Sequence, residues 1–131
     1  MKYLLDTNTC IFIMKKNSGV IARFKEVKDS GVVISSITLA ELELGVSKSQ
    51  AIERNRNALF AFSTLVNVLS FDVTAATEYG NIRATLEKKG QPIGILDTLI
   101  AAHAKSLNLT LVTNNIREFQ RVDGLIIEDW I

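Results

Sequence analysis

The sequence predicts an α/β fold in which helices cover both faces of a mostly parallel central sheet. Short apolar runs typical of buried strands alternate with segments of helical periodicity along the whole chain. Pro92 is the only proline, and no linker-like stretch or internal repeat divides the sequence. Alternating strands and helices favour a parallel sheet that is covered on both sides. We therefore expect residues 1–131 to form one domain.

Five short segments rich in large apolar or β-branched residues predict the strands. The clearest is Val32-Val33-Ile34, and the N-terminal run Tyr3-Leu4-Leu5 is similar. The expected strands cover residues 2–5, 32–35, 66–69, 109–112 and 125–127.

Apolar residues at helical spacing predict the segments between the strands. The clearest case places apolar side chains and His103 three or four residues apart from Leu96 to Leu107. Another amphipathic helix is expected to end near Gly90, since glycine commonly follows a helix C-terminus. The first helix is expected to begin near Cys10, and four more are expected over about 39–46, 51–65, 73–86 and 96–107.

Composition excludes several classes of protein. Hydrophobic residues make up 47% of the chain, so a packed core is expected rather than disorder. No apolar run approaches the length of a membrane span, and Asp6 interrupts the N-terminal run too early for a signal peptide. Cys10 is the only cysteine and is expected to be buried, so no internal disulfide is possible. A cytoplasmic protein is the expectation.

The net charge of +1 gives no global argument for nucleic-acid binding. Basic residues do form local clusters, which are also typical of solvated helix faces. These clusters are Lys15-Lys16, Arg54 with Arg56, Lys88-Lys89, and Arg117 with Arg121.

Three acids lie at equivalent points of the predicted fold. Asp6 ends the first strand, Glu41 follows the second, and Asp97 begins the helix before the fourth. The run Thr113-Asn114-Asn115 directly follows that fourth strand. Because ligands of parallel sheets bind outside the carboxyl ends of the strands, we expect these residues to converge on one edge.

Each acid also has a structural interpretation. Glu41 with Thr38 fits a capping box, Asp97 fits an N-cap or a first-turn acid, and Asp6 could hold a turn. Capping, however, gives no reason for the acids to gather at one edge.

Gathered carboxylates repel one another unless a cation lies among them. Their hard oxygens favour Mg²⁺ or Mn²⁺, which can polarise a phosphate and activate water. Zinc is disfavoured because His103 is the only histidine and Cys10 the only cysteine. His103 lies on an apolar stripe and is expected to be structural, and Trp130 is expected to be a packing anchor.

Four runs in order resemble PIN-domain ribonucleases, and more closely the VapC toxins of type II toxin–antitoxin systems. The runs are Leu4–Asn8, Ser36–Leu42, Gly90–Ala104 and Leu111–Phe119, and the resemblance continues to Glu128-Asp129-Trp130. It implies a PIN-like fold and an endoribonuclease that depends on Mg²⁺ or Mn²⁺.

The resemblance also implies roles for single residues. Asp6, Glu41 and Asp97 match the family's acidic metal site, and Asn8 and Thr113 match polar positions that support it. Many PIN domains carry a fourth acid after the last strand of the site. This chain has Asn115 at that place and Glu118 three residues further on, so either could take that role.

The substrate and partners follow from the same resemblance. The Gly90–Gly94 loop and the run Thr113–Phe119 look like those of enzymes that cut initiator tRNA in the anticodon loop. A homodimer is implied, as is a VapB antitoxin whose C-terminal tail covers the acidic site and whose other half binds operator DNA. DNA would therefore be contacted only through the antitoxin. Arg83, Lys88, Lys89 and Arg117 are candidate contacts to the RNA backbone.

Two other functions compete with this interpretation. A haloacid-dehalogenase-like phosphohydrolase also places an aspartate after its first strand, but it needs a second acid two residues on, where this chain has Asn8. A non-catalytic RNA-binding or regulatory module would not need all three of Asp6, Glu41 and Asp97.

Overall fold

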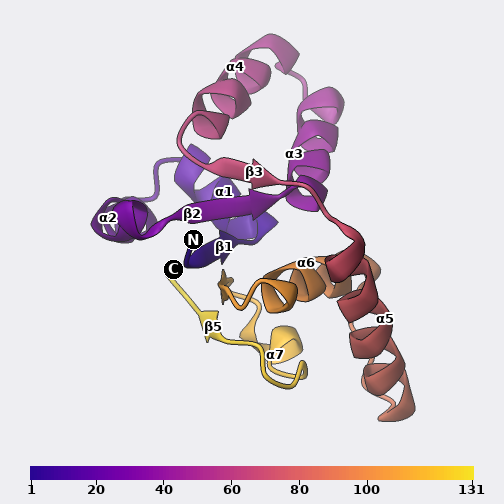
Figure 1. Cartoon of the computed structure of the whole chain (residues 1–131). Helices are drawn as coiled ribbons and strands as arrows, with labels where there is room; N and C mark the ends of the chain where they lie inside the picture. The colour runs from indigo at the N-terminus through magenta and orange to yellow at the C-terminus, as the bar shows by residue number, and fades with distance from the viewer.

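Five parallel strands form the central sheet of the computed structural model, which describes residues 1–131 (Figure 1). The order across the sheet is β3-β2-β1-β4-β5, and every neighbouring pair is parallel. The strands are β1 (Tyr3–Leu5), β2 (Val32–Ser35), β3 (Asn67–Leu69), β4 (Thr110–Val112) and β5 (Ile127–Glu128). The predicted parallel α/β sheet is therefore confirmed.

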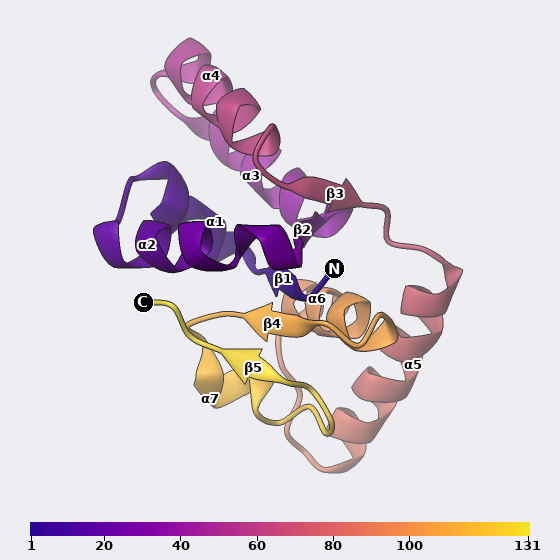
Figure 2. The same ribbon diagram turned by 60° about the vertical axis from the view of Figure 1, so that its left-hand side comes forward.

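Helices pack on both faces of this sheet, as predicted (Figures 1 and 2). Along β1, Tyr3 and Leu5 pack into the core of one face, which contains residues of α1 to α4, whereas Leu4 packs against α5 and α6 on the other. The helices are α1 (Thr7–Met14), α2 (Ser18–Val27), α3 (Ser36–Lys48), α4 (Ile52–Ser63), α5 (Val73–Lys88), α6 (Ile95–Ser106) and α7 (Ile116–Phe119), with a 3₁₀ turn at Lys28–Ser30. None of them combines the length and apolarity that a membrane span requires.

Two helices start earlier than their apolar patterns predict, because side chains cap them. The Asp6 carboxylate accepts a hydrogen bond from the Thr9 amide at 2.9 Å, so α1 begins at Thr7 rather than near Cys10. The Ser35 hydroxyl accepts from the Ile37 amide at 3.0 Å, so α3 begins at Ser36 rather than Leu39. The capping-box interpretation of Thr38 and Glu41 is therefore wrong, because both lie inside α3.

The pattern analysis did not predict α2 and α7. The side chain of Asn17 caps α2 by accepting from the Val20 amide at 3.1 Å. The short α7 follows β4 and buries Phe119 completely. The pattern of α2 was readable, since its buried Val20, Phe24 and Val27 follow helical spacing, whereas α7 is a single turn with little periodic signal.

The C-terminus is fixed to the centre of the sheet. Trp130 is 7% exposed and packs edge-on against Tyr3 of β1, with ring centroids 5.5 Å apart. The indole nitrogen of Trp130 donates to Glu128 at 2.8 Å, and Glu128 also pairs with Arg23 of α2 at 2.8 Å. Trp130 is thus a packing anchor, as predicted.

A buried hydrogen bond joins α6 to the start of α3. Nδ1 of His103 lies 2.8 Å from the hydroxyl of Ser35, and the two residues are 1% and 0% exposed. The ring of Phe71 packs edge-on against the imidazole. Burial lowers the pKa of His103 below its ordinary 6.5, only partly offset by the charge of Asp72. The neutral imidazole is therefore the form that the fold favours, and its structural role is confirmed.

We expect the pH dependence of stability to report this histidine. Below pH 6.5 the unfolded chain binds the proton more readily than the folded chain, so the free energy of unfolding falls as pH falls. The variant His103→Asn, whose amide can still bond Ser35, should lose less stability than the wild type between pH 7.5 and 5.5. Urea unfolding at both pH values measures this, and equal losses in the two proteins would contradict it.

Candidate active site

The site lies where the chain crosses from one half of the sheet to the other. The chain runs from β1 outward to β3, then returns to place β4 on the opposite side of β1. Such a crossing opens a crevice at the carboxyl ends of the two central strands. Asp6 directly follows β1 and Thr113 directly follows β4, and the Asp6 amide donates to the Val112 carbonyl at 3.0 Å.

Asp6 is the most deeply buried of the acids, with 5% of its surface exposed. Burial raises the pKa of this carboxyl, while hydrogen bonds from Thr113 and Thr9 act in the opposite direction. The negative charge of Asp129 adds a small further increase to the pKa. The fold thus holds a carboxylate away from water and stabilises it with the N-terminus of α1 and two hydroxyl groups.

Glu41 lies in the second turn of α3 and is oriented by a residue of α1. The hydroxyl of Thr7 donates to a carboxylate oxygen of Glu41 at 2.7 Å and lies 3.4 Å from the hydroxyl of Thr38. Thr7 was not among the predicted site residues. Its only signal in the sequence is its place directly after Asp6, since its partner Glu41 is 34 positions away.

Asp97 carries the clearest electrostatic evidence for a cluster. It is the third residue of α6, so the first-turn position considered for it is confirmed. The pKa of its carboxyl is raised to about 6. Burial is the largest cause, followed by the negative charges of Glu118, Asp6 and Glu41, in that order. Four carboxylates therefore share one electrostatic field at the carboxyl edge of the sheet.

The two candidates for a fourth acid lie in different settings. Asn115 precedes α7; its backbone amide donates to the Thr113 hydroxyl at 3.0 Å, and its side chain makes no hydrogen bond. Glu118, one turn later, is the charge that most strongly perturbs Asp97. Asn8 is exposed on α1, and its side chain also makes no hydrogen bond.

The donor set fits a hard divalent cation, although the side chains do not form a closed cage. No three Asp, Glu, His or Cys side chains converge closely enough to chelate an ion as they stand. Burial is the largest cause of the raised pKa of Asp97 and the charges of the neighbouring acids add to it, so a cation among the acids would favour their charged forms. Carboxylate oxygens are the ligands that Mg²⁺ and Mn²⁺ prefer.

The candidate RNA contacts differ in whether their charges are free. Arg83 bonds the Tyr79 hydroxyl at 2.6 Å and Glu87 at 3.1 Å, and Lys89 pairs with Asp123 at 3.1 Å. Lys88 and Arg117 are exposed and form no ion pair. Free charge is thus available at Lys88 and Arg117.

A parallel sheet with acids at its crossing point is the arrangement of the PIN domain, and the PIN-domain family model matches residues 3–125. PIN-domain nucleases generally use a divalent metal.

Comparison with known proteins gives the narrower family. The chain is 45% identical to the tRNA(fMet)-specific endonuclease VapC of Shigella flexneri and 48% identical to that of Salmonella typhimurium, over 99% of this chain and 98% of each relative. The structure superposes on VapBC2 of Rickettsia felis bound to a promoter DNA fragment with a TM-score of 0.96, at 41% identity and covering 100% of both chains. DNA-bound VapBC of Salmonella typhimurium gives 0.95, at 48% identity and covering 100% of this chain and 99% of the other. The chain belongs to the VapC ribonucleases of the PIN-domain family.

The repulsion at Asp97 predicts that Asp97→Asn stabilises the metal-free protein. Because the pKa of Asp97 is raised from 3.8 to about 6 in the folded protein, its ionisation lowers the free energy of unfolding as pH rises between these two values. Asparagine stays neutral and has no such effect. At pH 8 in EDTA the variant should gain about 1 kcal/mol, allowing for solvent screening, or about 4 °C in melting temperature. At pH 5 the difference should shrink.

Thermal unfolding at pH 8 and pH 5 checks this expectation. Asp29→Asn is the matched control, because Asp29 is exposed in the 3₁₀ turn and forms no ion pair. If Asp97→Asn melts no higher than the wild type at pH 8, the carboxylates are not crowded.

Proposed function

We propose that this chain is the toxin of a type II toxin–antitoxin system and a metal-dependent endoribonuclease acting on initiator tRNA in the cytoplasm. The observation that carries the proposal is the field shared by Asp97 with Glu118, Asp6 and Glu41. The relatives from Shigella flexneri and Salmonella typhimurium, described as tRNA(fMet)-specific endonucleases, support the substrate. We place the cut in the anticodon loop.

Asp6, Glu41 and Asp97 would hold Mg²⁺, with Mn²⁺ as an alternative, and Glu118 would be the fourth acid. A bound ion of this kind polarises a phosphoryl oxygen and lowers the pKa of an attacking water. The buried Asp6 keeps one carboxylate fixed in place through the Thr9 amide. Thr7 directs one oxygen of Glu41, which leaves the second oxygen free to ligate or to orient water.

Asn115 and Glu118 then have separate roles. The negative charge of Glu118 acts directly on Asp97, which is what a fourth acid requires. Asn115 instead shapes the turn after β4 through its backbone amide, which bonds Thr113. Thr113 in turn bonds Asp6, so the turn supports the buried carboxylate.

Substitution of single acids tests the proposal. Asp6→Asn preserves the N-cap of α1, because asparagine caps a helix as well as aspartate does. Asp6→Asn and Glu118→Gln should each reduce cleavage of end-labelled initiator tRNA in Mg²⁺ by about 100-fold, the upper range for loss of a residue supporting a metal site. Asn115→Ala should lose less activity than Glu118→Gln.

The assay uses purified initiator tRNA beside an elongator tRNA, with Mg²⁺ or with EDTA. A single fragment that is lost in EDTA supports the proposal, and end mapping gives the cut position. Cleavage that persists in EDTA or in Asp6→Asn would remove the proposed mechanism. Cleavage of the elongator tRNA alone would remove the proposed substrate.

An apolar groove beside Glu41 fits the second partner, a VapB antitoxin. The groove has a volume of about 320 Å³ and lies between α1, α3 and α4. A further hollow of about 550 Å³ continues it, since Met14 and Ala58 line both. The residues that give the first part its apolar surface are Ile11, Met14, Leu42, Val46 and Ala58.

We assign this groove to an apolar segment of the antitoxin. Glu41 lies at its edge, so a chain seated there would also reach the acidic site. The superposable structures from Rickettsia felis and Salmonella typhimurium are VapBC complexes bound to DNA, which supports such a partner for this chain. Contact with DNA would then come through VapB, and a homodimer of the toxin would carry two such grooves.

A substitution at Gly45 separates antitoxin binding from catalysis. Gly45 lies in α3 on the groove, and a side chain added there meets no atom within 4 Å. Gly45→Arg should therefore fold at least as well as the wild type, because glycine inside a helix costs about 1 kcal/mol. Because position 45 lies one turn after Glu41, the cleavage rate of the variant without VapB is measured first, and relative to that rate the variant should resist inhibition by the cognate VapB.

Gly80→Arg is the matched control, since Gly80 lies in α5 with equally open space. Titration of each variant with VapB in the cleavage assay gives the comparison. Equal inhibition of both variants would show that the antitoxin does not occupy the groove.

A further inference from the structure

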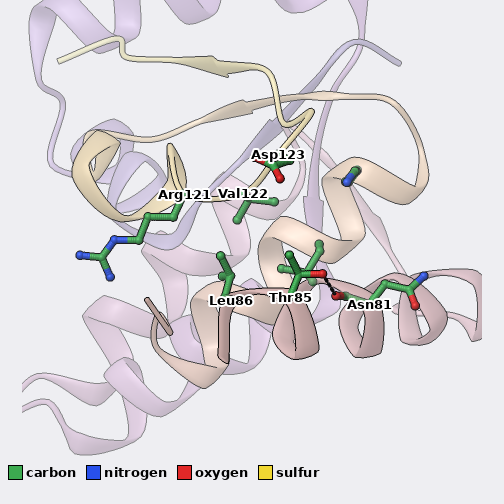
Figure 3. A pocket seen from close by; sticks show the side chains of 8 residues that line it. Asn81, Thr85, Leu86, Arg121, Val122 and Asp123 are labelled. Carbon is green, nitrogen blue, oxygen red and sulfur yellow. Dashed lines mark hydrogen bonds between the residues drawn. The ribbon is translucent and has the colours of Figure 1, made fainter. Parts of the chain in front are cut away.

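A second hollow lies away from the acids, between α5 and the segment that follows α7 (Figure 3). Its volume is about 150 Å³. Asn81 of α5 and Arg121 mark opposite ends in Figure 3, and Asp123 lies between them. Lys105, from the last turn of α6, also lines it. Polar groups from three separate segments thus surround one small cavity.

The charges around this hollow do not cancel. The carboxylate of Asp123 is 3.1 Å from the ammonium of Lys89, which neutralises it. Lys105 is partly buried, yet it forms neither an ion pair nor a hydrogen bond. Because the carboxylate of Asp123 is already paired with Lys89, the unpaired ammonium of Lys105 favours a further anion beside it.

The backbone next to Lys105 leaves room for its side chain. Gly124 has φ of +79°, and a Cβ placed on it would lie 3.5 Å from Cε and 3.8 Å from Nζ of Lys105. The lysine therefore rests against bare backbone at this turn. Its ammonium is held at the hollow rather than extended freely into solvent.

Two further donors are available to an anion. One guanidinium nitrogen of Arg121 donates to the Pro92 carbonyl at 3.1 Å, which leaves the other N–H groups free. The side-chain amide of Asn81 makes no hydrogen bond and can donate two. The Thr85 hydroxyl, by contrast, already donates its proton to the backbone carbonyl of Asn81 at 2.9 Å.

The hollow also connects with the acidic site through α7 and the loop before α6. Arg121 lies one turn after Glu118, and its amide donates to the Glu118 carbonyl at 3.1 Å. Its side chain bonds Pro92, which precedes Asp97 by five residues in the loop leading to α6. A strand of RNA leaving the acids along this side would pass Arg121 before it reaches Lys105.

We propose that this hollow binds the sugar–phosphate backbone of the RNA substrate at a distance from the cut, with Lys105 and Asn81 holding one phosphate and Arg121 contacting a neighbouring one. The inference rests on the proposed ribonuclease function. Phosphate contacts of this kind position the substrate and carry no sequence information. They release counter-ions, so affinity depends steeply on salt.

The test compares Lys105→Gln with Lys105→Arg and with Lys25→Gln. Lys25 is exposed on α2, on the other face of the sheet, and forms no ion pair, so its loss changes net charge equally. Affinity for fluorescent initiator tRNA is measured by anisotropy in EDTA, across a series of KCl concentrations. Steady-state cleavage in Mg²⁺ gives kcat and KM for the same proteins.

Lys105→Gln should weaken tRNA affinity roughly tenfold, the loss of one charge-assisted hydrogen bond. The slope of log affinity against log salt should fall in magnitude by about 0.7 to 0.9. KM should rise with kcat unchanged, Lys105→Arg should behave like the wild type, and Lys25→Gln should change neither affinity nor slope.

Asp123→Asn guards against an effect of misfolding. It removes the single negative charge at the hollow and releases Lys89, so it should tighten tRNA binding, which a damaged fold would not do. If the wild type cleaves tRNA but Lys105→Gln matches Lys25→Gln, the inference is overturned and the ribonuclease proposal stands. If the wild type neither binds nor cleaves tRNA, both fall.

Discussion

The burial of Asp6 at the carboxyl end of the central strand is the constraint on which the rest of the structure depends. Strand β1 has neighbours on both sides, so its last residues cannot avoid the interior. A carboxylate there is stable only if donors surround it; the Thr9 amide donates to it, and hydrogen bonding with Thr113 and Thr9 lowers its pKa against the effect of burial. The start of α1 and the turn after β4 therefore both lie against the Asp6 carboxylate and stabilise it.

The remaining acids are held by contacts that reach across the fold. Thr7 of α1 orients Glu41 of α3, and His103 of α6 bonds Ser35, the residue that caps α3. Through these two links, the helices that carry Asp6, Glu41 and Asp97 are joined in pairs. No buried side-chain nitrogen or oxygen lacks a hydrogen-bond partner. The remaining unfavourable polar energy lies in the burial and mutual repulsion of the carboxylates, both of which a cation would offset.

The strands and the acids could be predicted from the sequence because their signals are local. Apolar runs such as Val32-Val33-Ile34 mark buried strands whatever surrounds them, and the parallel arrangement then places every residue that follows a strand at one edge. The role of Thr7 was missed for the opposite reason, since its partner Glu41 is 34 positions away. The start of α3 was missed although its signal is local: Ser35 caps the helix through the Ile37 amide, whereas the sequence interpretation placed the capping residue at Thr38.

The sequence pattern also could not decide whether Asn115 or Glu118 lies closer to the other acids. Position in the sequence favoured neither, because a shift of three residues along a helix keeps a side chain on nearly the same face. The three-dimensional arrangement of α7 against α6 brings the charge of Glu118 close enough to act on Asp97, whereas the neutral Asn115 carries no charge that could do so. Short helices such as α7 give little periodic signal, so their orientation must come from packing, here the complete burial of Phe119.

Separation of charge resolves an apparent conflict between composition and function. A net charge of +1 argues against an RNA-binding protein if charge is averaged over the molecule. The acids, however, are gathered at one edge of the sheet, and each of them lowers the total charge there. Four of the unpaired positive charges, at Lys88, Lys105, Arg117 and Arg121, belong to α5, α6, α7 and the segment after α7, and others, such as Lys25 of α2, lie elsewhere on the molecule. A polyanion drawn to these residues would reach the carboxylates from the side where α7 meets α6. A net charge near zero therefore does not exclude local attraction of a polyanion to these residues.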